Sequence, residues 1–160
     1  PVCSSAASDV YKRQAWRTTF IVGFPTETDQ DFEELVDFVS EGHFQHLGIF
    51  LYSDEDNIRS SKFGDPIPLS LKEERKNRLM EIQQKISREH HQKMVGSLQQ
   101  VLVGGFSSET DLLLEGRNQY QGPEVDGVVY INEGNATSAG FHQVEITEAH
   151  EYDLVGKILN

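Results

Sequence analysis

The stretch Val22 to Thr28, VGFPTET, contains residue types that a ligand-binding turn could use. One glycine and a proline without a backbone N–H cannot supply the row of N–H donors that cradles a phosphate. Glu27, Asp29 and Asp31 follow at once, and their carboxylates suit the positive end of a helix dipole but would repel an anion. The turn therefore suits a neutral or cationic ligand, such as nucleoside hydroxyls or a sulfonium. A helix cap with acidic, solvent-facing residues is the alternative interpretation.

A strand, a helix and a second strand are the elements that would position this turn. Residues 18–22, TTFIV, are β-branched or aromatic and predict a buried strand of a parallel sheet. Thr28 and Asp31 have the spacing of a capping box, and an apolar helical pattern follows at Phe32, Leu35, Val36 and Val39. Residues 46–53, HLGIFLYS, predict a second buried strand. This repeat predicts an α/β fold, in which ligand-binding groups lie at the carboxyl ends of the strands.

A long helix and a set of short strands are predicted for the rest of the chain. Ser70 and Glu73 have capping-box spacing after the loop GDPIPLS. Leu79, Ile82 and Ile86 mark one face of the helix, and its charged residues of both signs predict a solvated surface. Glycine-containing turns then separate five strand candidates at residues 98–104, 111–117, 125–132, 141–148 and 152–159. Five short strands of this kind predict a small closed barrel of the OB-like type.

Composition restricts the classes of function that the chain can have. Its 160 residues carry a formal net charge of -12, which argues against indiscriminate binding to nucleic acid or to an anionic membrane. Cys3 is the single cysteine, so no intrachain disulfide can form, and this cysteine usage fits a cytoplasmic protein. No apolar run approaches the roughly 20 residues that span a bilayer. His43 and His46 have i, i+3 spacing, but without a third ligand nearby we expect no metal site.

The turn and its flanking elements resemble a known enzyme family. RTTFIVGFPTETDQDFEELVDFV at residues 17–39, followed by GIFLYSDED at residues 48–56, resembles the last part of the radical S-adenosylmethionine barrel of methylthiotransferases. Thr26 departs from the family pattern, in which glycine is usual at that position. The resemblance implies that four residues of the turn lie beside the adenosyl part of the cofactor: Gly23, Phe24, Pro25 and Glu27.

The C-terminal part resembles a TRAM domain through EGRNQYQGPEVDGVVYIN at residues 115–132 and EYDLVG at residues 151–156. The fold implied is α/β followed by all-β: the terminal βα units of a partial TIM-like radical S-adenosylmethionine barrel, a linking helix and a five-stranded OB-like barrel. We therefore expect four parts, namely an artefactual or disordered tail at 1–14, the C-terminal part of the radical S-adenosylmethionine barrel at 15–66, the linking helix at 67–93 and the TRAM domain at 94–160.

The family's catalytic groups are not expected in this chain. In the family, the three-cysteine motif of the catalytic cluster and the cysteines of a second cluster lie upstream of the matched segments. The resemblance implies that the full-length parent uses S-adenosyl-L-methionine and two 4Fe-4S clusters, whose irons need thiolate ligands. Because Cys3 alone cannot supply these ligands, we expect the chain to bind no cofactor, to hold no catalytic or metal-binding residue and to be inactive by itself.

Charge favours one branch of the family. Between Met94 and Asn160 two cations, Arg117 and Lys157, stand against ten acidic residues, which gives a formal charge of -8. RNA-binding barrels need a basic track along the phosphates, so nucleic acid is not the expected partner. The RimO branch methylthiolates an aspartate of small-subunit ribosomal protein number twelve, and an acidic barrel suits docking of a basic ribosomal protein. We expect the docking carboxylates to be Glu124, Asp126, Glu151 and Asp153.

Two alternatives stay open at this point. The first is a fragment of the MiaB-like branch, which modifies an adenosine in transfer RNA. The second is a stand-alone RNA-binding TRAM module to which a truncated scaffold is attached. A three-cysteine motif in the upstream reading frame would distinguish an enzyme fragment of either branch from the stand-alone module.

Overall fold

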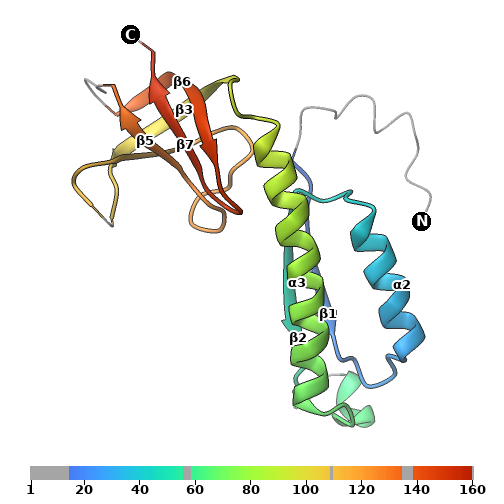
Figure 1. Cartoon of the computed structure of the whole chain (residues 1–160). Helices are drawn as coiled ribbons and strands as arrows, with labels where there is room; N and C mark the ends of the chain where they lie inside the picture. Colours follow the sequence, from blue (N-terminus) through green and yellow to red (C-terminus); the bar gives the residue numbers. More distant parts are fainter. Residues whose placement is uncertain (1–14, 56–58, 109, 135–138, 160) are drawn as a thin grey trace.

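The structure, a computed structural model, describes residues 15–55, 59–108, 110–134 and 139–159. It contains a strand pair covered by two helices, and a β-barrel at the far end of the longer helix (Figure 1). The predicted tail at 1–14, including its single cysteine, lies outside the described residues. None of the described helices is long and apolar enough to cross a membrane.

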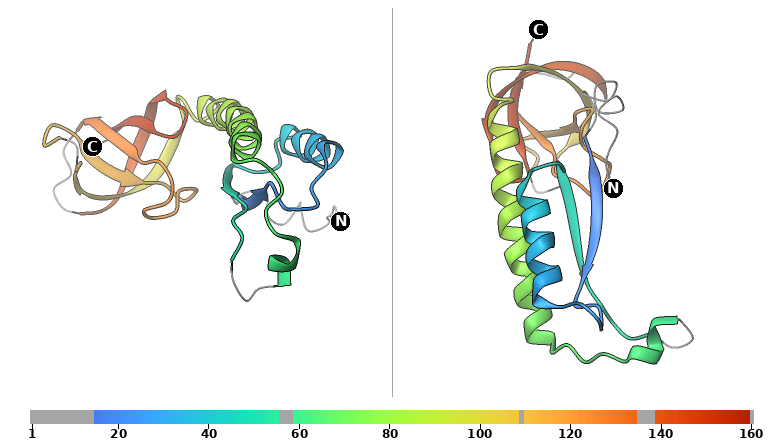
Figure 2. Two further views of the ribbon diagram at one scale, coloured as in Figure 1. Left: turned by 90° about the horizontal axis from the view of Figure 1, so that it is seen from below. Right: turned by 90° about the vertical axis from the view of Figure 1, so that its right-hand side faces the viewer.

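The first unit is the predicted strand–helix–strand repeat. Strands β1 (Arg17–Val22) and β2 (His46–Leu51) pair in parallel, which confirms both predicted strands. Helices α2 (Asp29–Ser40) and α3 (Leu69–Gln92) lie on the same side of this pair (Figure 2). A short 3-10 helix, η1, spans Arg59–Phe63 between β2 and α3.

Only one face of the strand pair is buried. Apolar side chains on that face pack under the helices in a core made of Val22, Phe32, Val36, Val39, Leu47, Ile49 and Leu79. On the opposite face Ile21 and Phe50 are paired across the strands and are 58% and 64% exposed. Strands that read as buried on both faces are characteristic of parallel sheets covered on both sides. Here the barrel contacts the second face at Arg17 and His46, where the strands begin, whereas the apolar side chains of Ile21 and Phe50 stay exposed.

One of the two predicted capping boxes is present. At α2 the backbone N–H of Asp31 donates to Thr28 Oγ1 at 3.2 Å, and the N–H of Thr28 donates to Asp31 Oδ2 at 2.8 Å. The prediction of a second capping box at Ser70 is wrong. Helix α3 begins at Leu69, its N-cap is Pro68, and no side chain caps it. Pro68 has φ of -58° and ψ of 142°, so the chain leaves its extended conformation there, and Ser70 lies inside the first helical turn.

The second unit is the predicted five-stranded closed barrel. Its strands are β3 (Leu98–Phe106), β4 (Leu114–Arg117), β5 (Val129–Glu133), β6 (Gly140–Ala149) and β7 (Leu154–Ile158), and they close in the order β3-β4-β5-β7-β6. Strands β5 and β7 pair in parallel, and the other pairs are antiparallel. The interior is filled by Val101, Val103, Val129, Ile131, Val144, Ile146, Leu154 and Ile158.

Helix α3 connects the two units and contacts both. Its first turns lie at the carboxyl ends of β1 and β2, where Lys72 contacts Gly23 and Tyr52. Its last turn contacts the barrel, where Nδ1 of His91 donates to the backbone carbonyl of His150 at 3.1 Å. A single rigid element therefore runs from the strand-end turn to the barrel.

Candidate functional site

The turn after β1 is built around a glycine that no other residue could replace without strain. Gly23 has φ of +80°, in the left-handed region. A Cβ atom added at Gly23 would lie 2.4 Å from Cγ of Lys72. The N–H of Gly23 donates to Oε2 of Glu27 at 2.9 Å, and the N–H of Glu27 donates to the carbonyl of Phe24 at 2.8 Å. The turn is thus held in one conformation by its own backbone and by a side chain of α3.

Two cations of α3 are buried against this turn, which corrects the prediction of a fully solvated charged surface. Lys72 and Arg75 are only 2% and 3% exposed. Nζ of Lys72 donates to the carbonyl of Tyr52 at 2.8 Å and pairs with Asp65. Burial of an unpaired charge would be costly, so these cations are buried because the strand ends present carboxylates and a free carbonyl. Sequence reasoning missed them, since nothing in the α3 pattern distinguishes them from its solvated charges.

Arg75 neutralises the acidic side of the turn. Its guanidinium pairs with Glu27 and, at 2.6 Å, with Asp29. The Glu27 carboxylate is therefore shared between Arg75 and the N–H of Gly23. Glu27 is one of the four residues that we predicted beside a cofactor. In this structure its carboxylate is bonded within the chain and holds the turn in place, so it is not free to bind a ligand.

Aromatic rings form the wall next to the turn. Phe24 packs edge-on against Tyr52 at 5.3 Å and against Phe63 at 6.3 Å between ring centroids, and it is 38% exposed. The Tyr52 hydroxyl is buried and has no hydrogen-bond partner among the described residues. The partly exposed ring of Phe24 and the fixed backbone turn suit contact with a nucleoside, and the arrangement contains no nucleophile beside a base.

The predicted docking carboxylates are divided by the structure. Glu124 is exposed and adopts φ of +63° at the edge of a groove of about 370 Å³, which Glu115 and Arg117 also line. Asp126 has a side chain only 4% exposed, and it pairs with Arg17.

The other two carboxylates are also engaged within the chain. Glu151 lies 3.4 Å from Arg88 of α3, and Asp153 accepts a hydrogen bond from the N–H of Val128 at 2.8 Å. Glu124 is therefore the one predicted docking residue for which the described contacts show no partner inside the chain. The other three lie where the barrel meets the first unit or brace a barrel loop.

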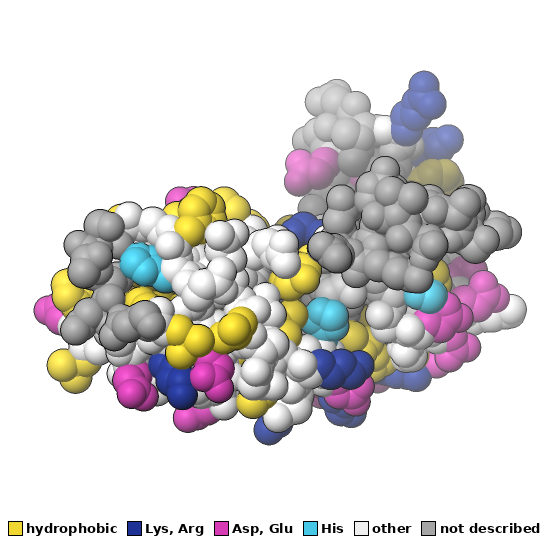
Figure 3. Space-filling model, turned by 90° about the horizontal axis from the view of Figure 1, so that it is seen from above, with side chains coloured by type: hydrophobic (Ala, Val, Ile, Leu, Met, Phe, Trp, Pro, Cys, Tyr) yellow, Lys and Arg dark blue, Asp and Glu magenta, His cyan; other side chains and the backbone are white. Residues whose placement is uncertain are grey.

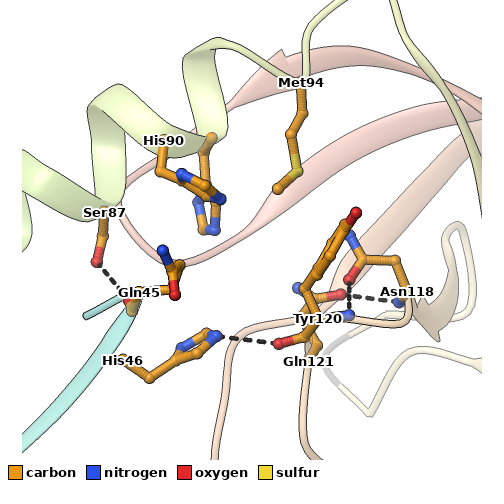
Figure 4. A pocket seen from close by; sticks show the side chains of 9 residues that line it. Gln45, His46, Ser87, His90, Met94, Asn118, Tyr120 and Gln121 are labelled. Atoms are coloured by element: carbon orange, nitrogen blue, oxygen red, sulfur yellow. Dashed lines mark hydrogen bonds between the residues drawn. The ribbon is translucent and has the colours of Figure 1, made fainter. Parts of the chain in front are cut away.

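Three histidines meet at the contact between the two units. His46 of β2 and His90 and His91 of α3 line a cavity of about 10 Å³, which Asn118 and Gln121 of a barrel loop also line (Figure 4). Burial is the largest cause that lowers the pKa of both His90 and His91, and for His90 the neighbouring His91 and Lys93 act in the same direction. No group of three or more His, Cys, Asp or Glu side chains in the described part of the chain is arranged to hold a metal ion.

Comparisons with known proteins agree with the motifs. Residues 95–159 match the TRAM domain family. The chain is 47%, 48% and 50% identical to ribosomal protein uS12 methylthiotransferases RimO from Desulfotalea psychrophila, Anaeromyxobacter sp. (strain K) and Bdellovibrio bacteriovorus, over 146, 145 and 143 residues. The chain is thus similar to part of these RimO proteins over about nine-tenths of its own length.

The RimO alignments cover 91%, 91% and 89% of this chain but only 33%, 31% and 31% of those relatives. The chain therefore spans about a third of the length of the curated relatives it matches. The predicted resemblance to the RimO branch and the predicted TRAM barrel are confirmed. The assignment of residues 15–66 to a radical S-adenosylmethionine barrel stays a prediction.

Proposed function

We propose that this chain is the C-terminal part of an enzyme that methylthiolates an aspartate of ribosomal protein uS12. In this proposal residues 15–66 complete a radical S-adenosylmethionine barrel, residues 67–93 form the linking helix and residues 94–160 form a docking TRAM domain. The observation that carries the proposal is the similarity to RimO proteins over about nine-tenths of the chain. The relatives described above are all of the RimO type, which favours this branch over the MiaB-like alternative.

The uncovered face of the strand pair supports its place in a larger barrel. Ile21 and Phe50 expose apolar side chains on a parallel sheet, and parallel sheets are normally covered on both faces. In a barrel this face would line the interior, with the Gly23 turn at the rim formed by the carboxyl ends of the strands. The other strands of the barrel, supplied by the remaining two-thirds of the parent, would enclose this face.

The residues of the turn fit one wall of an S-adenosylmethionine site. Gly23 and Pro25 would present backbone, Phe24 would present its ring, and Glu27 with Arg75 would hold the turn in place. When bound, S-adenosylmethionine supplies radical chemistry, which is a property of the cofactor and its cluster rather than of these residues. Iron–sulfur clusters need thiolates, and the described residues include no cysteine. We therefore propose that the chain alone is inactive.

We propose that the acidic barrel docks the ribosomal protein and that Glu124 lies at the centre of the docking surface. The barrel surface seen in Figure 3 mixes hydrophobic and acidic side chains with few Lys or Arg. Glu124 and Glu115 line the groove of about 370 Å³, which is large enough for a lysine or arginine side chain of a basic protein. Asp126, Glu151 and Asp153 would contribute through the overall negative field, because their carboxylates already have partners in the chain.

The test is a titration of the full chain against uS12 and against transfer RNA, at low and moderate salt. We expect binding to uS12 with an association rate that falls as salt rises, and weaker binding to transfer RNA. Glu124→Lys should weaken the uS12 complex more than Asp111→Lys, which makes the same change of net charge at another exposed position of the barrel unit. Equal effects would show that only net charge matters. Tighter binding to transfer RNA would refute the assignment of the substrate.

A further inference from the structure

The contact between the barrel and the first unit is made largely by charged groups. Asp126 of the barrel lies against Arg17 of β1 and against His46 of β2, and it also accepts a hydrogen bond from the N–H of Gly122 at 2.6 Å. Arg88 of α3 adds a second, exposed pair with a barrel carboxylate. Exposed pairs contribute little, whereas the Asp126 carboxylate is almost fully buried. The contact therefore depends mainly on what surrounds Asp126.

His46 faces a hydrogen-bond acceptor on each side of its ring. Nδ1 lies 3.0 Å from Oδ1 of Asp126, and Nε2 lies 3.0 Å from the backbone carbonyl of Tyr120. A carbonyl and a carboxylate can only accept hydrogen bonds. A neutral imidazole carries a single N–H, so it can donate to one of these acceptors but not to both. Only the doubly protonated ring makes both contacts.

The side chains across the cavity are consistent with one positive charge at this position. His91 donates from Nδ1 to the carbonyl of His150, which leaves its Nε2 free to accept in the neutral form. Burial lowers the pKa of His90 and of His91, which favours the neutral form of each ring. Figure 4 shows His46 and His90 on opposite sides of the same cavity, so a second charged imidazole there would be repelled.

Two barrel amides show that the contact is incompletely bonded. Oδ1 of Asn118 accepts from the N–H of Tyr120 at 2.9 Å, and Oε1 of Gln121 accepts from the N–H of Asn118 at 3.0 Å. These two backbone donors fix the orientation of both side-chain amides, because each donor bonds the amide oxygen. The NH₂ group of each amide must then find its own acceptor. Both NH₂ groups are buried without a partner among the described residues. Such unpaired donors offset part of the stabilisation, so the bonds that are made matter more, and those of His46 stand beside the Arg17–Asp126 pair and the bond from His91 to the carbonyl of His150.

We propose that His46, in its doubly protonated form, is the latch that holds the TRAM barrel against the β1–β2 sheet. The groups facing it are Asp126 and the Tyr120 carbonyl from the barrel, Arg17 from the neighbouring strand, and His90 and His91 from α3. A ring with a single N–H would keep only one of its two hydrogen bonds, so the latch needs both N–H groups. The latch depends only on contacts within this chain and not on the proposed enzymatic activity.

The experiment is nitrogen-15 NMR of the full chain. We expect both ring nitrogens of His46 to carry a proton, and the relaxation rates of β3 to β7 to match those of α2 and β1, as in two units that tumble as one body. A singly protonated His46 while the units still tumble together would overturn the latch.

A variant tests the same point independently. His46→Gln replaces the two ring N–H groups by one amide nitrogen and one acceptor oxygen, so it cannot donate from both ring positions. The variant should uncouple the two units while the amide spectrum of the barrel stays dispersed. His43→Gln is the matched control, because His43 pairs with Glu41 on the exposed surface at 2.6 Å, away from the barrel, and it should leave the coupling unchanged. Tumbling of His46→Gln as a single body would overturn the latch even if the ring of the wild-type protein is doubly protonated.

Discussion

Replacing Gly23 with alanine tests whether α3 and the strand-end turn are packed against each other as tightly as the geometry indicates. Two costs are expected. The left-handed φ of +80° costs an alanine roughly 1–2 kcal/mol. The new Cβ would lie 2.4 Å from Cγ of Lys72, and overpacking of this kind costs about 1–3 kcal/mol. The sum predicts a loss of roughly 2–5 kcal/mol in the stability of the first unit.

The two costs can be separated by a double-mutant cycle. Lys72→Ala removes the side chain that the new Cβ would strike, so in that background Gly23→Ala should cost only the backbone strain of roughly 1–2 kcal/mol. Lys72→Met keeps the stem of the side chain and removes its charge, so in that background the full cost should remain. The pair of backgrounds therefore distinguishes steric contact from electrostatics.

Unfolding in urea can be followed by the fluorescence of Trp16. This is the single tryptophan of the sequence. Its backbone N–H donates to Oε1 of Gln45, and it directly precedes β1. Its fluorescence therefore reports on the first unit and not on the barrel. Equal costs of Gly23→Ala in the Lys72→Ala and Lys72→Met backgrounds would refute the steric contact.

Three further predictions follow from the same structure. Thr28→Ala should lower the stability of the first unit by about 1 kcal/mol through loss of the α2 cap, measured by the same fluorescence, whereas Ser70→Ala should have little effect because Ser70 is not a cap. For His90 and His91 the pKa is lowered from its ordinary value of 6.5 by burial, so the unfolded chain takes up protons first as the pH falls. The contribution of these two histidines to folding stability should be fully present above about pH 6.5 and should be lost as the pH falls through their lowered pKa values. Urea unfolding midpoints measured between about pH 7.5 and 5 check this, and midpoints that do not change with pH would contradict the burial of the two rings. Amide exchange should be slow in the closed barrel of β3 to β7 and faster in β1 and β2, which have free edges; equal protection would mean that something else stabilises the strand pair.

The elements of this protein could be read from its sequence because their signals are local. The β-branched and aromatic residues of β1, the helical spacing of Phe32 to Val39 and the capping box at Thr28 each depend on residues within a few positions of one another. Glycines mark the connections from β4 to β5 and from β5 to β6, and these are local signals as well. The cap predicted at Ser70 failed for a local reason too, because Pro68 two residues earlier already ends the extended segment.

The roles of the charged residues were decided by the tertiary structure alone. Asp126 and Glu151 read as docking carboxylates, yet their partners Arg17 and Arg88 are 109 and 63 residues away in the chain. Composition reports how many charges a segment has but not what lies opposite each one after folding. The same separation in sequence conceals the partners of Lys72, Arg75 and His46. Burial and pairing of a charge depend on surfaces that only meet when α3 packs on the strands and the barrel closes against them.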